Sequence, residues 1–153
     1  MGDYLRTTRE CKLDELEPKW VTAVLHHAET YQLGDITQAA PLCCETRSTK
    51  KKKGLFGGKP EVIVTGIVVT TQWLIWAAGK EGDAPAVASA RLRDIQVQDY
   101  EKSAMYKLVQ DSGLNIFGLH TDSPDPGSTF IGLGPEPAAQ KLRNLLKEAV
   151  EQA

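Results

Sequence analysis

The segment that most constrains the fold runs from Val62 to Ala78 and reads VIVTGIVVTTQWLIWAA. Its Val, Ile, Thr and Trp residues suit a pleated, packed surface better than a helix. Gly66 interrupts the run, and the polar triplet Thr70-Thr71-Gln72 divides it into two parts. The run is also shorter than the ~20 apolar residues that a transmembrane helix needs. The segment therefore predicts two adjoining buried strands joined by a tight bend.

The length and charge of the chain indicate one globular domain that carries one basic segment. At 153 residues the chain is close to the usual size of a single domain. The net charge is −2, but the segment from Arg47 to Lys59 holds six basic residues and no acidic residue, so the remainder carries −8. No apolar run of the secretory kind follows Met1, and we therefore expect a cytoplasmic protein.

Residues 1–37 are predicted to form an N-terminal helical extension. Pro18 suits the first turn of a helix and Gly34 suits its end, so we expect a short turn over 13–17 and a helix from Pro18 to about Gln32. Apolar residues recur there at helical spacing and define a stripe that the rest of the chain should cover. The stripe consists of Leu13, Leu16, Trp20, Val24 and Tyr31, widened by Val21, Leu25 and Ala28.

Beyond residue 41 the apolar period changes to two, which is typical of strands. We expect seven short strands at 42–49, 62–69, 73–78, 87–91, 92–100, 114–120 and 129–133, separated by turns rich in Gly and Pro. Residues 101–109 suit either a helical turn or an edge strand. The chain then closes with an amphipathic helix whose apolar stripe consists of Leu142, Leu145, Leu146, Ala149 and Val150.

The central segment and the order of the predicted elements resemble bacterial pleckstrin-homology-like (PH-like) and GRAM-type domains. The similar residues are Gly66-Ile67-Val68-Val69-Thr70, the turn Thr71-Gln72, the strand Trp73-Leu74-Ile75-Trp76, and Arg91-Leu92-Arg93-Asp94-Ile95-Gln96-Val97. The resemblance covers residues 41–153 of this single domain. It implies a mostly β (α+β) fold, in which a seven-stranded antiparallel barrel is closed by the C-terminal helix. Leu142, Leu146 and Val150 would then pack into the mouth of the barrel, near Trp73 or Trp76.

The basic loop is the candidate site that follows from this resemblance. Lipid-binding members of the family hold the headgroup in the hairpin between their first two strands. They also place a basic-x-Arg pair on the second strand, where this chain has Glu61 and no Arg, so we expect no stereospecific inositol-phosphate pocket. The alternative is a solvated lysine loop without a ligand. Residues expected to contact an anionic surface are Lys50, Lys51, Lys52, Lys53, Leu55, Phe56 and Lys59.

No constellation of residues predicts catalysis, a metal or a cofactor. His26 and His27 are adjacent, so on a helix they diverge by about 100° and do not share a metal. His120 has only loop neighbours, and the glycine-rich segment 54–59 lacks the spacing and context of a phosphate-binding loop. We therefore expect a protein that is not an enzyme.

The three cysteines are expected to be reduced packing residues. Cys43 and Cys44 are adjacent in a predicted strand, so their side chains should point to opposite faces. That arrangement suits neither a disulfide between them nor a shared metal.

These observations favour a non-catalytic PH-like module that binds or scaffolds a protein partner. The alternative is peripheral binding to an anionic membrane surface, at its inner face, through the Lys50–Lys59 loop. Nucleic acid is not expected as a partner, because the basic charge is confined to one loop without interleaved aromatic residues. A homo-oligomer is left open.

Overall fold

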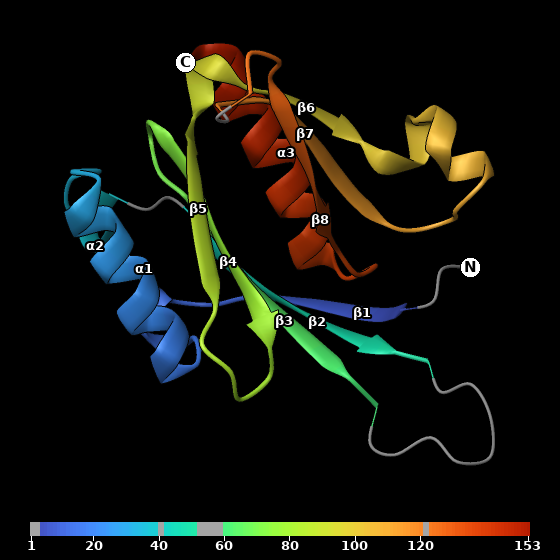
Figure 1. The fold of residues 1–153 in the computed structure, drawn as a ribbon, viewed down its shortest axis with the longest axis horizontal. Helices are drawn as coiled ribbons and strands as arrows, with labels where there is room; N and C mark the ends of the chain where they lie inside the picture. The colour runs from blue at the N-terminus through green and yellow to red at the C-terminus, as the bar shows by residue number, and fades with distance from the viewer. Residues whose placement is uncertain (1–3, 40–41, 52–59, 121–122) are drawn as a thin grey trace.

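The computed structural model describes residues 4–39, 42–51, 60–120 and 123–153. Within them, eight strands form two antiparallel sheets, with a helical layer on one face of the larger sheet (Figure 1). The five-stranded sheet has the order β1 (Tyr4–Glu10), β2 (Leu42–Lys50), β3 (Val62–Val69), β4 (Trp73–Lys80), β5 (Ala86–Arg91). The three-stranded sheet has the order β6 (Gln96–Asp99), β7 (Gly113–Leu119), β8 (Gly127–Gly132). The helices are α1 (Pro18–Thr30), α2 (Ile36–Ala39) and α3 (Pro137–Gln152), and the 3-10 turns are η1 (Leu13–Glu15), η2 (Leu92–Asp94), η3 (Tyr100–Lys102) and η4 (Ala104–Lys107).

The expected closed, seven-stranded barrel is wrong. The sheets stay separate, and α3 contacts β1 and β2 of the larger sheet as well as β6 of the smaller one (Figure 1). Its apolar face therefore fills the space between the two sheets, where a closed barrel would have strand-to-strand pairing. The predicted strand over residues 92–100 also divides, because η2 turns the chain from the first sheet into the second and leaves only β6 extended.

The N-terminal segment is not wholly helical, because it begins with β1. This strand pairs antiparallel with β2, with Thr8 opposite Thr46 and a hydrogen bond of 2.8 Å between their hydroxyl groups. The backbone N–H of Gly134 donates to the Thr8 hydroxyl (2.9 Å), and the Thr8 N–H donates to Glu136 (2.7 Å). A Cβ at position 134 would lie 2.6 Å from the carbonyl oxygen of Arg6, so glycine permits this close approach.

The two central strands and their bend are confirmed as β3 and β4. Val69 lies opposite Leu74, and the Thr70 N–H donates to the Trp73 carbonyl (2.9 Å). The Thr70 hydroxyl oxygen in turn accepts the N–H groups of Gln72 (3.2 Å) and Trp73 (2.9 Å). This short polar side chain satisfies the backbone donors of the bend, which explains why a polar triplet interrupts so apolar a run.

Side-chain alternation divides the apolar residues into two cores, one on each face of the larger sheet. On β3, Ile67 and Val69 point toward α3 and the smaller sheet, whereas Val64 and Val68 point toward α1. Cys44 belongs to the first core and Cys43 to the second, as predicted from their adjacency. With both faces covered, the central strands read as continuous apolar runs.

The helix α1 covers the second core and begins at the predicted residue. Trp20 is fully buried, and its indole N–H donates to the carbonyl oxygen of Ala77 (3.2 Å). Gly66 lies beneath this helix, where an added Cβ would be 3.1 Å from Leu16 Cδ1. The expected burial of Tyr31 is wrong, because α1 ends at Thr30 and the Tyr31 side chain is 64% exposed.

The helix α3 packs as predicted along most of its stripe. Leu142 and Leu146 are fully buried, whereas Val150 is partly buried at the edge of the same core. Trp76 also packs against this core, but Trp73 lies on the opposite face of the sheet. Among the described helices, none is both long and apolar enough to cross a membrane.

Candidate functional site

The predicted lysine site falls only in part on the described residues. Lys50 ends β2 and Lys51 follows it, and both side chains are exposed. The backbone N–H of Lys50 donates to the carbonyl oxygen of Glu61 (2.8 Å), which closes the base of the β2–β3 connection. The remaining predicted contacts, Lys52, Lys53, Leu55, Phe56 and Lys59, lie outside the described residues.

Arg47, the first cation of the basic segment, is paired with carboxylates of the body. Its guanidinium lies 3.0 Å from Glu17 Oε1 and 3.4 Å from Glu45 Oε1, and it also forms an ion pair with Glu81. Its charge is thus balanced at the junction of β2, β4 and α1. Within this basic segment, electrostatic attraction of an anionic ligand would therefore depend on the lysines.

A different surface stands out in the connection between β6 and β7. This segment, gold in Figure 1, projects at one end of the molecule and carries η3 and η4. Three apolar side chains on it are exposed: Met105 by 53%, Leu108 by 80% and Val109 by 54%. We call these three residues the apolar knob. Three exposed apolar side chains within five residues form a patch, which is the kind of surface feature that marks interaction sites.

Internal contacts hold the apolar knob in one conformation. The N–H groups of Leu108 and Val109 both donate to the Met105 carbonyl, at 3.0 and 2.8 Å. The Tyr100 hydroxyl donates to the Val109 carbonyl (2.5 Å) and so ties the two ends of the segment together. The Tyr100 ring also packs edge-on against Tyr106 and Phe130, with centroid distances of 6.2 and 5.0 Å.

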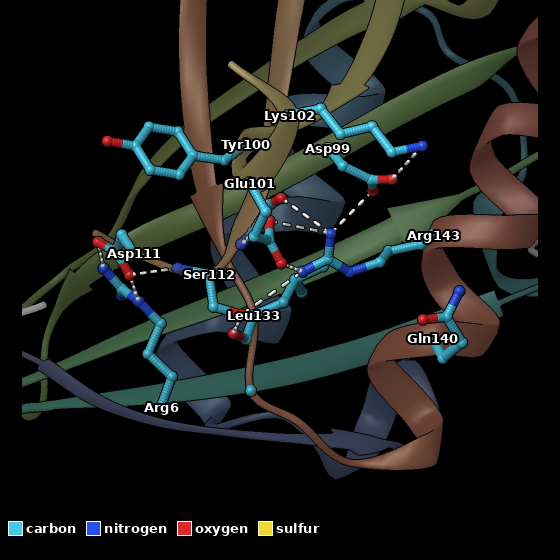
Figure 2. A network of polar contacts seen from close by, with 12 residues as sticks. Arg6, Asp99, Tyr100, Glu101, Lys102, Asp111, Ser112, Leu133, Gln140 and Arg143 are labelled. Carbon is cyan, nitrogen blue, oxygen red and sulfur yellow. Dashed lines mark hydrogen bonds and ion pairs between the residues drawn. The ribbon is translucent and has the colours of Figure 1, made fainter. Parts of the chain in front are cut away.

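Arg143 of α3 fixes the start of the projecting segment (Figure 2). Its buried guanidinium donates to Asp99 Oδ1 (2.8 Å), Glu101 Oε2 (2.9 Å) and the Gly113 carbonyl (3.1 Å). Lys147 adds a bond to Asp99 Oδ2 (2.7 Å). Burial would raise the pKa of Asp99, but the hydrogen bonds from Lys147 and Arg143 outweigh it and lower that pKa below its usual value. Two carboxylates already balance the Arg143 charge, so this arginine is a structural anchor and does not form an anion site.

Arg6 of β1 fixes the end of the same segment (Figure 2). Its Nε and Nη2 atoms donate to the two carboxylate oxygens of Asp111, at 2.9 and 2.8 Å. Asp111 also accepts the Ser112 N–H (2.7 Å), and the Ser112 hydroxyl donates to the Leu133 carbonyl (2.7 Å). Burial opposes the charge of Asp111, yet the hydrogen bonds from Arg6 and Ser112 lower its pKa. The apolar knob is therefore anchored at both ends.

The sequence did not identify the apolar knob as a site. Residues 101–109 suited a helical turn or an edge strand, and in the structure they form two 3-10 turns. Their apolar residues are of the kind that usually fills a core. The available signal was the acidic residues on both sides of the apolar knob, Asp99 and Glu101 before it and Asp111 after it, which meet arginines from distant elements.

The histidines do not assemble into a catalytic group. His27 Nε2 hydrogen bonds the Ser89 hydroxyl (2.8 Å) between α1 and β5, and His26 lies beside Thr30 on the same helix. His120 is exposed, with Asp94 as its neighbour at 3.3 Å. Within the residues that the structure describes, no three His, Cys, Asp or Glu side chains are grouped as a metal site would require. The expectation that the chain is not an enzyme stays a prediction.

Comparison with known proteins gives no match to a family model, a curated protein or a solved structure. A fold alone hosts many functions, so the residues of the site decide what this chain does.

Proposed function

We propose that this chain is a non-catalytic, PH-like binding module that docks a protein partner through the apolar knob. The order of elements supports the class: the meander β2–β5 is followed by the three-stranded unit β6–β8 and by a terminal helix. This order is the one that the sequence resemblance implies. β1 and α1 are then additions that extend the first sheet and cover its outer face.

The observation that carries the proposal is that the apolar knob is both exposed and pre-organised. Exposed apolar side chains gain affinity when a partner buries them, at about 1.5–3 kcal/mol for a fully buried Leu or Met. A flexible segment loses part of that gain when binding orders it. The contacts of Tyr100, Arg143 and Arg6 have already fixed this segment in the free chain. Leu108 is the most exposed of the three and is the expected anchor.

The charge of the chain favours a protein over a membrane as the binding partner of the apolar knob. Outside the basic segment 47–59 the chain carries −8, so an anionic bilayer would repel the body that presents the apolar knob. A concave apolar pocket on a protein matches its small size and fixed shape. Binding to anionic lipid through the Lys50–Lys59 loop is the competing outcome, and vesicle pelleting detects it.

The test incorporates a photoreactive amino acid at position 108 of the full chain, expressed in the cells that naturally produce this protein. A matched chain carries the same group at Leu5, which is 63% exposed on β1. A protein cross-linked from position 108 and not from position 5 is then purified. Its affinity is measured for wild type, Leu108→Ser, Met105→Ser and the control Leu5→Ser. Loss of one buried apolar side chain at about 1.5–3 kcal/mol should weaken binding about 10- to 150-fold.

The proposal holds if both knob variants lose affinity while Leu5→Ser keeps it. It is overturned if the purified partner binds Leu108→Ser as tightly as wild type, or if positions 5 and 108 cross-link alike. Vesicle pelleting that disappears in high salt, and also when Lys50, Lys51, Lys52 and Lys53 are all replaced by Ser, would instead support the membrane alternative.

A further inference from the structure

Cys11 and Cys43 face each other across the edge of the larger sheet. Cys11 directly follows β1 and continues its ladder with β2, since Glu10 lies opposite Cys44 and the Cys11 N–H donates to the Cys43 carbonyl (3.0 Å). The two Sγ atoms are 3.8 Å apart. Cys44 points into the other core and takes no part in the pair.

The two thiols of the pair occupy different environments. Cys11 is partly buried and lines an open groove of about 650 Å³ that Leu13, Val21 and Leu25 also border, whereas Cys43 is buried at its floor. A hydrogen bond from the Cys43 thiol lowers the pKa of Cys11, and the Arg9 guanidinium adds to the effect. The same pairing, together with burial, raises the pKa of Cys43. Cys11 is thus the more acidic and the more exposed of the two thiols, which is the pattern of a reactive cysteine beside a second thiol.

We propose that Cys11 and Cys43 are a redox-active pair that a hydroperoxide converts to a reversible disulfide. The Cys11 thiolate attacks the terminal peroxide oxygen, so an S–O bond forms, the O–O bond breaks and the leaving oxygen takes up a proton as water or an alcohol. Cys43 sulfur then attacks the Cys11 sulfenic acid. The S–S bond forms, the S–O bond breaks, and the hydroxide leaves with the Cys43 proton as water. Two thiols are oxidised and one peroxide is reduced.

The backbone geometry permits this bond without rearrangement of the sheet. Directly opposed residues of an antiparallel pair have Cα atoms about 4.5–5.5 Å apart, which lies within the range for disulfides. The sulfur atoms must then approach from 3.8 Å to about 2.05 Å, which side-chain rotation supplies. The bond would close a ring that contains η1, α1 and α2, and it would tie the helical layer to β2. This inference does not depend on the proposed partner of the apolar knob.

The test treats the reduced, purified full chain with a stoichiometric amount of hydrogen peroxide and then blocks the remaining thiols with an alkylating agent. Thiols counted after denaturation should fall from three to one, and digestion should yield a Cys11–Cys43 cross-linked peptide. Dithiothreitol should restore all three thiols. Hydrogen exchange across residues 11–43 should slow in the oxidised chain relative to the reduced one.

Variants assign the roles of the three cysteines. Cys44→Ala should still form the bond, whereas Cys11→Ser should not react and Cys43→Ser should accumulate a sulfenic acid that dimedone traps. The inference is overturned if wild type keeps its thiols, if fragmentation of the cross-linked peptide shows that Cys11 is bonded to Cys44, or if oxidation yields a disulfide-linked dimer through Cys11 in place of the internal bond.

Discussion

Arg6 and Asp111 form a two-point ion pair across 105 residues of sequence, with both N–O distances below 3.0 Å. Arg6 belongs to the edge strand of the larger sheet, and Asp111 stands just before β7 of the smaller one. The pair therefore couples the N-terminal strand to the base of the segment that carries the apolar knob. Arg6 also lies over the Phe130 ring, 5.4 Å from its centroid, which places the same side chain against β8.

Replacing Asp111 by Asn should destabilise the chain and loosen the projecting segment. The change removes the carboxylate that Arg6 and Ser112 contact, at a cost of about 1–3 kcal/mol for a partly buried, charge-assisted pair. Urea unfolding should show the loss, and hydrogen exchange should rise over residues 100–111. The exposed carboxylate of Asp14 offers the control, and Asp14→Asn should change neither quantity. Equal exchange in wild type and Asp111→Asn would contradict the anchoring role.

Arg143→Lys should behave as a disruptive change, although the charge is conserved. A lysine ammonium cannot reproduce the planar fork that reaches Asp99, Glu101 and the Gly113 carbonyl together. Arg143→Met leaves the two carboxylates without that partner, and we expect a loss of about 3 kcal/mol, since Lys147 still serves Asp99. Chemical denaturation of both variants is the measurement. A lysine variant as stable as wild type would show that the fork geometry is unimportant.

Leu146→Ala should cost about 2–5 kcal/mol of unfolding free energy, because it opens a cavity in the core between the two sheets. Leu5→Ala, at an exposed position of β1, should cost less than about 0.5 kcal/mol. The comparison of urea midpoints tests whether α3 joins the sheets as described. Similar midpoints for the two variants would contradict this packing.

His27 should make the chain less stable on mild acidification. Burial lowers its pKa below the usual value of about 6.5, and the charge of His26 lowers it further. The unfolded chain therefore binds the proton more readily, so stability is complete above about pH 6.5 and falls as the pH drops through the lower folded-state pKa. Urea midpoints measured across this range should show the decline, and His27→Gln should reduce it. A midpoint in wild type that is constant between pH 7 and the onset of carboxylate protonation would refute the prediction.

Local patterns predicted the elements whose partners lie nearby in sequence. The start of α1 at Pro18, the bend at Thr70 and the buried face of α3 all follow from spacing and turn chemistry within a short window. β1 was missed because Arg6 and Glu10 obscure its alternation and its partner strand begins at Leu42. Closure of the sheets was mispredicted for the same reason, since the placement of α3 between them depends on contacts that no local window contains.

The candidate site was harder to predict than the fold. Met105, Leu108 and Val109 read as core residues, and their exposure results from the aromatic and ionic contacts beneath them. The Cys11–Cys43 pair likewise depends on the unpredicted strand β1, whereas the opposite orientations of Cys43 and Cys44 followed from strand periodicity alone. The lysine loop was the most conspicuous sequence feature, and only Lys50 and Lys51 of its predicted contacts lie within the described residues.

The hydrogen bonds of Thr8 have a consequence for the order of events during synthesis. Thr8 leaves the ribosome long before its partner Thr46, and longer still before Gly134 and Glu136. The contacts of β1 are thus completed only after more than a hundred further residues have been made, and such distant pairings are the slow ones to form. Until the chain beyond residue 110 is made, β1 has only β2 beside it, so a nascent chain leaves this strand partly exposed to chaperones.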